Sequence, residues 1–514
     1  MILTYFTRYK GIRKFFLMSL LPMLLGAYLW IVIPFAWTKV DLATIQRQSG
    51  GYAVVTLNAK EDRDLIKDIF SLLVGATPTL KYAGTLGEPL WVVTLRSGNR
   101  WIYYQAMDDG YVYRKVWGTD LSDGPSWYLC IPGDAVTKEL EQQIFGSFDD
   151  PQRVLPVSAQ ETAPRQEGQL ARFVTGTLMN DQGGVYTNFH DDRPEKQDEA
   201  RNHDILSEST GLLMEYALQT NDQELYRQQV AYTRKYLSSP CGVLSWKVRD
   251  ADGISQPSSA LIDDLRIAAA LIQGCERWQN RQDLMLARGI LEGVYRFEQL
   301  NGSWRPWYDW SGVEKSWKSW HENLMPNGAS VLPVRYLAPD YIAIAATVDE
   351  RFADLVPQAT EVIKAADLQN GLFATDVDPA NGPFQEKLEV NMIDSLLTAW
   401  NGARGGYVSK PTVEFLKKEL KKGHIYASYH RNQQKKAIPM TQVESPAVYA
   451  LAALFLWHAG EPDWANRAVD HLLLHRISNI QSPFFGGFGD PRTGDCYSFD
   501  NLMALQALAV VRKQ

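Results

Sequence analysis

Six acidic or amide side chains in this chain stand just ahead of long apolar segments. The first is Glu208, in the stretch Leu206–Leu218, which is apolar on nearly every face and therefore predicts a buried helix. The equivalent residues of the later segments are Asp264, Asp340, Asn391, Glu444 and Asp500, and we call all six the repeat positions. A carboxylate at the edge of a buried helix can give or take a proton, so acid–base catalysis is the chemistry to expect there.

The repeat positions follow one another at intervals of 56, 76, 51, 53 and 56 residues. Periods of this size are typical of a repeat architecture. Between the apolar segments lie amphipathic ones, each with the single wet face of a helix that packs on a core. They comprise residues 224–237, 283–300, 351–366, 413–421 and 464–475, and a similar segment at 169–179 precedes the first repeat.

This alternation predicts a mainly α fold, an (α/α)6 barrel of six helical hairpins. The apolar helices form the inner ring and the amphipathic helices the outer one, because only the latter have a face suited to water. The segment at 169–179 pairs with the last inner helix and closes the ring. All six repeat positions then lie at one end of the barrel, which we expect to be acidic.

The N-terminal region of the 514-residue chain predicts a membrane anchor. Residues 15–37 are 23 residues without a charge, long enough to span a bilayer, and basic residues precede them. The basic flank favours a cytoplasmic N-terminus, and the apolar run ends without a small-residue cleavage site. We therefore assign residues 1–40 to a basic cytoplasmic start and an uncleaved transmembrane signal anchor. The rest of the chain is expected outside the cytoplasm, at the cell membrane.

Three further segments complete the predicted organisation, since so long a chain exceeds a single core. Residues 41–150 predict a small α+β domain, which has no catalytic constellation and which we interpret as a spacer or a partner-docking module. Its strands are expected at 52–57, 90–95, 100–105 and 111–117, and its helix at 62–74. Residues 151–168, rich in Pro, Gln and Glu, predict a linker, and the barrel occupies 169–514.

Composition argues against some classes of function. The net charge of −7 speaks against nucleic acid as a partner. Cys130, Cys241, Cys275 and Cys496 show no metal-ligand spacing and the eight His residues form no HExxH motif, so we expect neither a metal nor a cofactor. An extracytoplasmic location permits a disulfide, but the sequence indicates no pair.

Two motifs in the barrel segment resemble those of glycoside hydrolase family 8. Ser207-Glu-Ser-Thr-Gly-Leu-Leu-Met214 is similar to the family's Ser-Glu-Gly-Gln-Gly-Tyr-Gly-Met, which holds the proton donor. Ala260-Leu-Ile-Asp-Asp-Leu-Arg-Ile-Ala268 is similar to its Ala-Ser/Thr-Asp-Gly/Ala-Asp-x-x-Ile-Ala helix, and Leu337-Ala-Pro-Asp-Tyr341 lies near its Tyr-Phe-Ala-Pro segment. The resemblance covers 169–514 and implies inverting hydrolysis on a ring of six helical hairpins. The anchor is similar to that of membrane-anchored, exopolysaccharide-associated members.

The resemblance makes Glu208 the candidate proton donor. Cleavage of a glycosidic bond needs one carboxylic acid to protonate the leaving oxygen and one carboxylate to activate water or to attack directly. Burial and neighbouring acids raise the pKa of such a donor, whereas a helix N-terminus favours its ionised form. The structural alternative for Glu208 is a helix N-terminal cap.

The general base does not carry over from the family. Asn391 stands where many members have the base, and Asp394 stands where they have an Arg. We take Asp394, one turn further into its helix, as the candidate base. Glu389, Asp376 and Asp378 are the alternatives.

Other polar and aromatic residues are candidates for holding the sugar. Asp264 matches the second Asp of the family's helix motif, and we assign it to the sugar at the cleavage point, with Asp263 as its stand-in. The segment Asn301–Trp320 holds five of the 16 Trp, whose flat rings suit either stacking on pyranose sugars or packing of the segment itself. The candidate substrate contacts are Asp263, Asn391, Tyr341, Trp304, Trp307, Glu444 and Asp500.

These observations predict a membrane-anchored, extracytoplasmic glycoside hydrolase. The resemblance implies that the substrate is a β-linked polysaccharide such as β-1,4-glucan, xylan, chitosan or a related exopolysaccharide. The expected partners are this polysaccharide, the membrane and a polysaccharide synthase or export complex. The alternatives are a catalytically inactive polysaccharide-binding protein on the same fold and a polysaccharide lyase.

Overall fold

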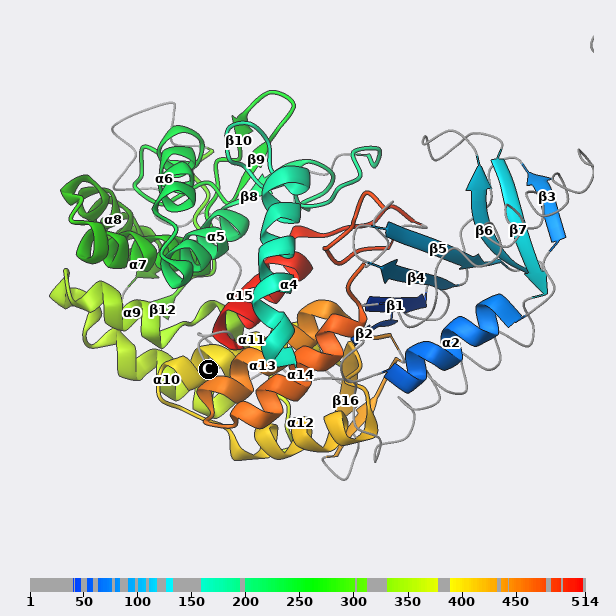
Figure 1. Cartoon of the computed structure of the whole chain (residues 1–514). Coiled ribbons are helices and arrows are strands. Elements are labelled where there is room, and N and C mark those ends of the chain that lie inside the picture. Colours follow the sequence, from blue (N-terminus) through cyan, green and yellow to red (C-terminus); the bar gives the residue numbers. More distant parts are fainter. Residues whose placement is uncertain are drawn as a thin grey trace, which may run out of the picture. The chain divides into compact units, whose positions relative to one another are not determined.

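The computed structural model divides the chain into two compact units, Met1–Val157 and Ser158–Gln514 (Figure 1). In the first unit the structure describes residues 40, 42–47, 53–58, 63–75, 79–83, 91–97, 100–107, 111–117 and 126–132. In the second it describes residues 159–194, 199–300, 303–311, 331–377, 389–431, 436–441, 443–477, 482–490 and 493–511.

The predicted membrane anchor, residues 15–37, lies outside the described residues. Within the described part of the chain, no helix is both long and apolar enough to cross a bilayer.

The described residues of the first unit form a seven-stranded antiparallel sheet in the order β2-β1-β4-β5-β6-β7-β3 and the helix α2 (Arg63–Gly75). The strands are β1 (Leu42–Arg47), β2 (Ala53–Asn58), β3 (Thr79–Ala83), β4 (Trp91–Ser97), β5 (Arg100–Ala106), β6 (Tyr111–Trp117) and β7 (Ser126–Pro132). The helix buries Ile66, Ile69, Phe70 and Leu73, the spacing of one helical face. The helix and the four strands expected from the sequence are present, while β1, β3 and β7 were not anticipated.

The second unit is mainly helical, and its inner helices close a ring. Each inner helix contacts the next in the order α5, α7, α9, α11, α13 and α15, and α15 contacts α5 again. Their bounds are α5 (Ser207–Thr220), α7 (Leu261–Trp278), α9 (Pro339–Ala346), α11 (Met392–Arg404), α13 (Pro446–His458) and α15 (Ser498–Val511). Helix α13 is buried continuously from Ala447 to Leu456, as expected of a helix that is apolar on every face.

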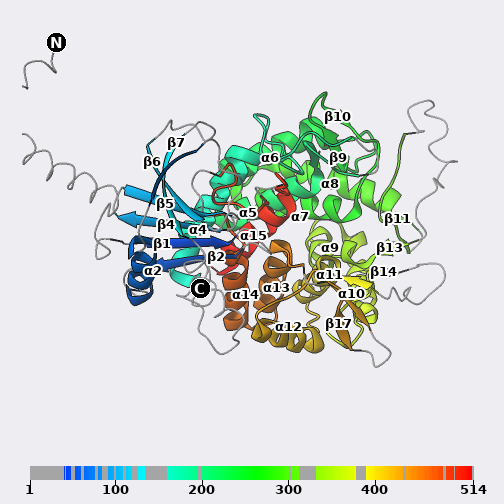
Figure 2. The same cartoon turned by 90° about the vertical axis from the view of Figure 1, so that its right-hand side faces the viewer.

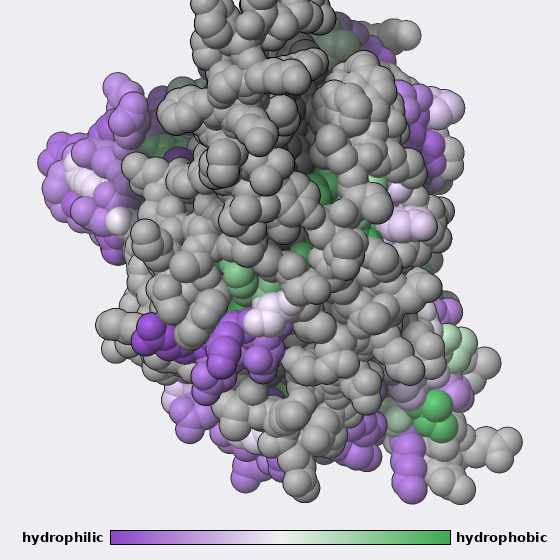
Figure 3. Space-filling model, turned by 45° about the vertical axis from the view of Figure 1, so that its right-hand side comes forward, coloured by the Kyte–Doolittle hydropathy of each residue, from purple (hydrophilic) through white to green (hydrophobic). Residues whose placement is uncertain are grey.

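The outer helices surround this ring, and each shows one buried face. They are α4 (Ala159–Phe173), α6 (Gln223–Tyr232), α8 (Arg281–Gly293), α10 (Leu355–Ala366), α12 (Lys410–Lys422) and α14 (Pro462–Leu474). Helix α8, for example, buries Ala287, Ile290 and Leu291. The first helix, α4, packs on the last, α15, so the predicted closure of the ring is confirmed (Figures 1 and 2). The described surface in Figure 3 is mostly hydrophilic, with only small apolar areas.

Three outer helices end in a π-helical turn of five residues. These turns are η3 (Val174–Leu178), η4 (Thr233–Leu237) and η5 (Val294–Glu298), which follow α4, α6 and α8. A π turn is rare in proteins and often marks a functional region. Its repetition shows that successive hairpins share the same local geometry.

Short strands lead into several inner helices and join the loops at that end of the ring. One sheet has β8 (Asp204–Leu206), β9 (Lys247–Arg249) and β10 (Ile254–Ser255), and another has β15 (Glu389–Asn391), β16 (Ser428–Arg431) and β17 (Ala437–Pro439). Two strand pairs complete the set, β11 (Gln299–Leu300) with β12 (Ser303–Trp304), and β13 (Leu332–Pro333) with β14 (Asp376–Val377). The described part of the ring also has the 3-10 turns η7 (Val334–Tyr336) and η8 (Glu350–Phe352).

Two details differ from the expectation. Helix α4 begins at Ala159, inside the segment 151–168 whose composition predicts a linker, because that segment also contains good helix formers such as Ala, Gln and Glu. Helix α9 has only eight residues and begins at Pro339, after the 3-10 turn η7. Both differences concern where a helix starts rather than the order of the helices.

Candidate active site

Glu208 occupies the first turn of α5, and strand β8 leads directly into it. The N-cap residue is Leu206 and no side chain caps this helix end, so Glu208 is not the capping residue. Glu208 is partly exposed, whereas Ser207 and Ser209 on either side are buried. The helix thus presents a carboxyl group at the end of the ring that is not used to satisfy the backbone.

The pKa of Glu208 is raised to about 7, first by burial and second by the negative charge of Asp263. The positive charges of Arg266 and Arg335 act in the opposite direction, as does the helix N-terminus. The effects that favour the neutral acid therefore outweigh those that favour the carboxylate. Glu208 can hold a proton near neutral pH and give it up, which is what a general acid requires.

Asp263, in the first turn of α7, is the acid that the structure places beside Glu208. Its carboxylate accepts hydrogen bonds from Ser207 Oγ at 2.8 Å and from Arg266 Nη1 at 2.7 Å. Burial raises the pKa of Asp263, while Arg266 and Ser207 lower it. Because Ser207 directly precedes Glu208, the first bond ties the start of α7 to the start of α5.

A second group near Glu208 comes from the turn η7 and from α11. Arg335 Nε lies 3.3 Å from Asp394 Oδ1, and the side chains of both residues are about a quarter exposed, 28% and 27%. Burial raises the pKa of Tyr336 to about 12; Arg335 lowers it, and Asp263, Glu208 and Asp394 each raise it. Tyr336 is therefore within electrostatic reach of all three carboxyl groups, which places Glu208, Asp263 and Asp394 around one region.

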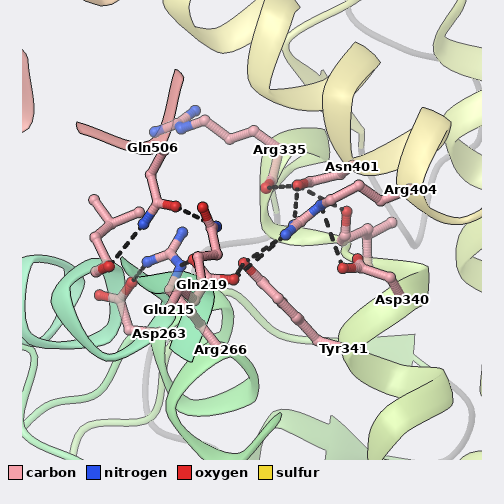
Figure 4. Close-up of polar contacts among 12 residues, drawn as sticks. Glu215, Gln219, Asp263, Arg266, Arg335, Asp340, Tyr341, Asn401, Arg404 and Gln506 are labelled. Atoms are coloured by element: carbon pink, nitrogen blue, oxygen red, sulfur yellow. Dashed lines mark hydrogen bonds and ion pairs between the residues drawn. The ribbon is translucent and has the colours of Figure 1, made fainter. Parts of the chain in front are cut away.

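Below this region a buried network of charges continues into the ring (Figure 4). Arg266 Nε lies 3.8 Å from Glu215 Oε2 on α5, and Glu215 Oε1 accepts a hydrogen bond of 2.5 Å from the hydroxyl of Tyr341 on α9. Arg404, at the end of α11, donates to that hydroxyl at 2.9 Å and lies 3.2 Å from Asp340 Oδ2. Burial alone would lower the pKa of Arg266, but Tyr341, Asp263 and Glu215 raise it overall, so the guanidinium stays charged.

Five of the repeat positions lie at the same end of the ring. Ser207 donates a hydrogen bond to Asp263, which links α5 to α7. Ser209 Oγ lies 3.3 Å from Ser498 Oγ, which links α5 to α15. Ser445, just before α13, donates to Asp500 of α15 at 3.2 Å. Ala427 accepts from the backbone of Met392 and donates to that of Val443, which links α11 to α13.

Asp340 is the exception to the predicted arrangement. It pairs with Arg404 in the last turn of α11, whereas Asn391 caps the first turn. A helix of 13 residues is about 20 Å long, so Asp340 lies deeper in the ring than the end marked by Asn391. The reason is the late start of α9 at Pro339. Tyr341 accordingly belongs to the buried network rather than to the exposed end.

Asp264 faces away from Glu208, contrary to its assignment as the sugar ligand. It is fully buried, accepts a hydrogen bond of 2.6 Å from the backbone N–H of Leu244 and pairs with Glu298. Asp263, the stand-in, is the residue beside Glu208. Successive residues of a helix point about 100° apart, so only one of two adjacent acids can face the neighbouring helix start.

Three further candidates have local structural partners. Asn391 caps α11 by accepting from the backbone N–H groups of Ile393 and Asp394. Asp500 accepts from the backbone N–H of Ala447 at 3.0 Å, at the start of α13. Glu444 is bound by the hydroxyl of Tyr449 and lies 3.7 Å from His475; burial would raise the pKa of Glu444, but His475 and Tyr449 lower it overall.

Two of the alternative bases lie on short strands, and the third lies outside the described residues. Glu389 is exposed on β15, and Asp376 is buried on β14, where its carboxylate accepts from Thr375 at 2.9 Å. Asp378 lies outside the described residues.

The aromatic segment after β12 lies against the start of α7. Pro306 and Tyr308 accept backbone hydrogen bonds from Leu261 and Ser259, respectively. Trp307, between them, is exposed, whereas Trp304 is buried. Of the two candidate stacking residues, Trp307 is thus available to a ligand and Trp304 serves packing.

Sequence reasoning missed the three arginines of the site, Arg266, Arg335 and Arg404. A signal existed for Arg266, because an arginine inside the apolar segment of α7, three residues after Asp263, implies a buried ion pair. For Arg335 and Arg404 no such signal exists, because their partners come from distant segments. The described residues contain no cluster of His, Cys, Asp and Glu suited to a metal ion.

Comparisons with known proteins agree with this fold. No protein-family model matches the chain. A curated relative, the "Putative lipoprotein YdaJ" of Bacillus subtilis (strain 168), is 28% identical over 340 residues, 65% of this chain and 84% of the relative. The solved structure of a novel alpha-amylase from Clostridium perfringens is 26% identical with a TM-score of 0.60, covering 67% of this chain and 97% of that one.

The similar solved structures also include a family 8 enzyme. A GH8 xylobiose complex from Teredinibacter turnerae is 16% identical with a TM-score of 0.49, covering 71% of this chain and 96% of that one. The chain resembles glycoside hydrolase family 8. The motif at Ser207–Met214, which carries the resemblance in the sequence, is also the segment that holds Glu208 at the end of the ring.

Replacing Arg404 tests the buried network. Arg404→Met keeps much of the volume but leaves Asp340 and Glu215 without their shared cation, so we expect a loss of about 3–5 kcal/mol in unfolding free energy. The matched control is Arg296→Met, whose side chain is 62% exposed and pairs with Glu292, and which should cost less than about 1 kcal/mol. Thermal and urea unfolding followed by circular dichroism measures both. Equal effects of the two substitutions would contradict the account of the network.

Proposed function

We propose that this protein is a glycoside hydrolase that cleaves a β-linked polysaccharide by an inverting mechanism. The observation that carries the proposal is Glu208, a partly exposed acid whose pKa is raised to about 7 at the end of a helical ring. Asp263 lies on one side of it, and the Arg335–Asp394 ion pair lies within electrostatic reach. Glycosidic cleavage needs one carboxylic acid and one carboxylate, and Glu208 and Asp394 are the two groups that we assign to these roles.

In the proposed mechanism Glu208 donates its proton to the leaving glycosidic oxygen. Asp394, a carboxylate paired with Arg335, accepts a proton from the attacking water. Inversion requires room for that water between acid and base. Arg335 acts electrostatically on Glu208 and pairs with Asp394, which supports Asp394 as the base of this site. Asp263, held by Ser207 and Arg266, contacts the sugar at the cleavage point. Trp307 offers an exposed ring for stacking on a further sugar.

A second substrate class is favoured by one comparison. The Clostridium perfringens structure is described as an alpha-amylase, which favours an α-linked glucan as the alternative to a β-linked polymer. The resemblance at Ser207–Met214 favours the β-linked class. Both classes need the same acid, so Glu208 is central to either.

Glu208→Gln is the direct test of this function. The substitution removes a proton and little volume, so we expect turnover to fall by about 10²–10⁴-fold while the helical fold is kept. The assay measures reducing ends released by the full chain from β-glucan, xylan, chitosan and starch, and NMR follows the anomeric configuration of the products.

Each other result selects a different function. Release from starch alone would replace the β-linked class by the α-linked one, and retention of configuration would overturn the inverting mechanism. An unsaturated product would indicate a lyase. Binding without cleavage would indicate a polysaccharide-binding protein. Full activity of Glu208→Gln would contradict the role of Glu208.

The pH dependence of activity tests the interaction between Glu208 and Asp263. Because the acid must be protonated, kcat/KM should fall as pH rises through about 7. Asp263→Asn removes the negative charge that helps to raise the pKa of Glu208, so this alkaline limb should move to lower pH. The control is Glu361→Gln, a 71% exposed side chain on α10, which should leave the limb in place. A limb that stays in place in Asp263→Asn would exclude the proposed coupling.

We also infer that the catalytic unit lies outside the cytoplasm and is anchored to the cell membrane through residues 15–37. The charge-free run supports this location, as does the word lipoprotein in the name of the Bacillus subtilis relative. Such a location suits trimming of a polymer beside its synthase or export complex. A reporter fused after Gln514 should be active only if it is of the extracytoplasmic type. Activity of a cytoplasmic reporter would refute the assignment.

A further inference from the structure

Asp264 and Glu298 form a buried pair of carboxyl groups that the proposed mechanism does not use. Both residues are 0% exposed. Asp264 Oδ1 accepts from the backbone N–H of Leu244 at 2.6 Å, and Glu298 Oε1 accepts from Ser259 Oγ at 2.5 Å. Their remaining oxygens, Asp264 Oδ2 and Glu298 Oε2, are buried and receive no hydrogen bond from a donor of the described residues. Each carboxyl group shifts the pKa of the other, so we treat the two as a pair.

Such a pair must carry a proton. Two carboxylates side by side in a dry interior repel each other and cannot both ionise. Burial raises the pKa of Glu298 to about 8, and Asp263 raises it too, whereas Ser259 and Asp264 lower it. The pKa of Asp264 is well above its usual range because of burial and Glu298, and Asp263 raises it as well. Near neutral pH the pair therefore keeps at least one proton between its two members.

Glu298 also departs from the repeat to which it belongs. It is the last residue of the π turn η5, and the last residues of the corresponding turns η3 and η4 are Leu178 and Leu237. Both leucines are fully buried, as is Glu298. Packing alone would be satisfied by a third leucine, so the carboxyl group at this position has a role beyond filling space.

The pair joins the segments that surround the start of α7. Leu244, bonded to Asp264, lies two residues before Trp246, whose carbonyl accepts the backbone N–H of Ser207 at 3.0 Å. Ser259, bonded to Glu298, also accepts from the backbone N–H of Tyr308 at 2.9 Å. The Asp264–Glu298 pair thus connects the first turn of α7 with the segment before β9 and with the aromatic segment that carries Trp307.

We propose that Glu298 is a positioning residue, whose pairing with Asp264 fixes the first turn of α7 so that the adjacent Asp263 faces Glu208. Asp263 and Asp264 are neighbours on one helix, and only one of them can face α5. Glu298 holds Asp264 on the opposite side and so determines which one does. The catalytic consequence rests on the proposed glycosidase function, but the existence of the protonated pair does not.

Infrared spectroscopy of the full chain tests the pair without any substrate. The C=O stretch of a protonated carboxyl group is separate from the bands of a carboxylate. At neutral pH, Glu208→Gln removes the proton of Glu208 and serves as the reference. The second protein carries Asp264→Asn and Glu298→Gln in addition to Glu208→Gln. In this triple variant two amides of the same shape replace the two carboxyl groups of the pair. The difference between the two spectra should contain a protonated carboxyl band, and a difference without that band would overturn the pair.

Activity of single variants tests the positioning role. Glu298→Gln keeps an acceptor for Ser259 and an N–H donor for Asp264, so kcat and the alkaline limb should remain near those of the wild type. Glu298→Leu restores the residue of the other two π turns but releases Asp264, so kcat should fall by about 10²-fold with KM little changed. Its alkaline limb should also move, because the distance from Asp263 to Glu208 changes.

The outcomes separate this inference from the proposed function. Wild-type kcat and an unmoved limb in Glu298→Leu would refute positioning while leaving the glycosidase intact. If Glu298→Leu does not fold, the activity of Glu298→Gln tests the positioning role instead. This variant keeps the acceptor for Ser259 and a donor for Asp264, so loss of activity in folded Glu298→Gln would also refute positioning. A wild-type chain that cleaves no polysaccharide removes the catalytic part, and the infrared band then decides whether the pair exists.

Discussion

The ion pairs of Arg266 are the interaction on which the described site depends. The guanidinium is buried in the middle of the helical ring, where an unpaired charge would be strongly destabilising. It pairs with Asp263 towards the end of the ring and with Glu215 towards its interior. Gly211 leaves the space for this side chain, because a Cβ at that position would lie 2.8 Å from Arg266 Cδ. The glycine of the Ser207–Met214 motif thus has a physical reason.

The pKa of Glu208 depends on two opposing effects of Arg266. Arg266 holds Asp263 in place beside Glu208, and the negative charge of Asp263 opposes ionisation of Glu208. Arg266 also attracts the Glu208 carboxylate directly, and so does Arg335. The balance leaves the pKa near 7 rather than at either extreme. Opposing charges from α7 and the turn η7 thus produce, at the start of α5, a proton donor that can be protonated or ionised near neutral pH.

The sequence predicted the ring because the spacing of its apolar segments and the polarity of the segments between them are visible without the structure. Continuous apolar runs such as Ala447–Leu456 can only be inner helices, and amphipathic ones such as α8 can only be outer helices. It also placed Glu208 at the start of an inner helix, since a motif and a repeat agreed there. It could not choose between Asp263 and Asp264, because by our proposal that choice depends on Glu298, which lies at the end of the π turn after α8. It misplaced Asp340 because the helix start at Pro339 depends on tertiary contacts with α11. The networks of Arg335 and Arg404 join residues far apart in the chain, which no local pattern records.

The proposed function depends on cleavage of a sugar chain at Glu208. The most direct measurement is a crystal or cryo-electron microscopy structure of the Glu208→Gln variant with a bound oligosaccharide of the polymer that the wild type cleaves. A glycosidic oxygen should lie within hydrogen-bond distance of the substituted side chain. Asp263 should contact the adjoining sugar, and Asp394 should lie on the opposite face with space for one water. An oligosaccharide bound elsewhere, or one whose glycosidic oxygens are all remote from position 208, would exclude cleavage at Glu208.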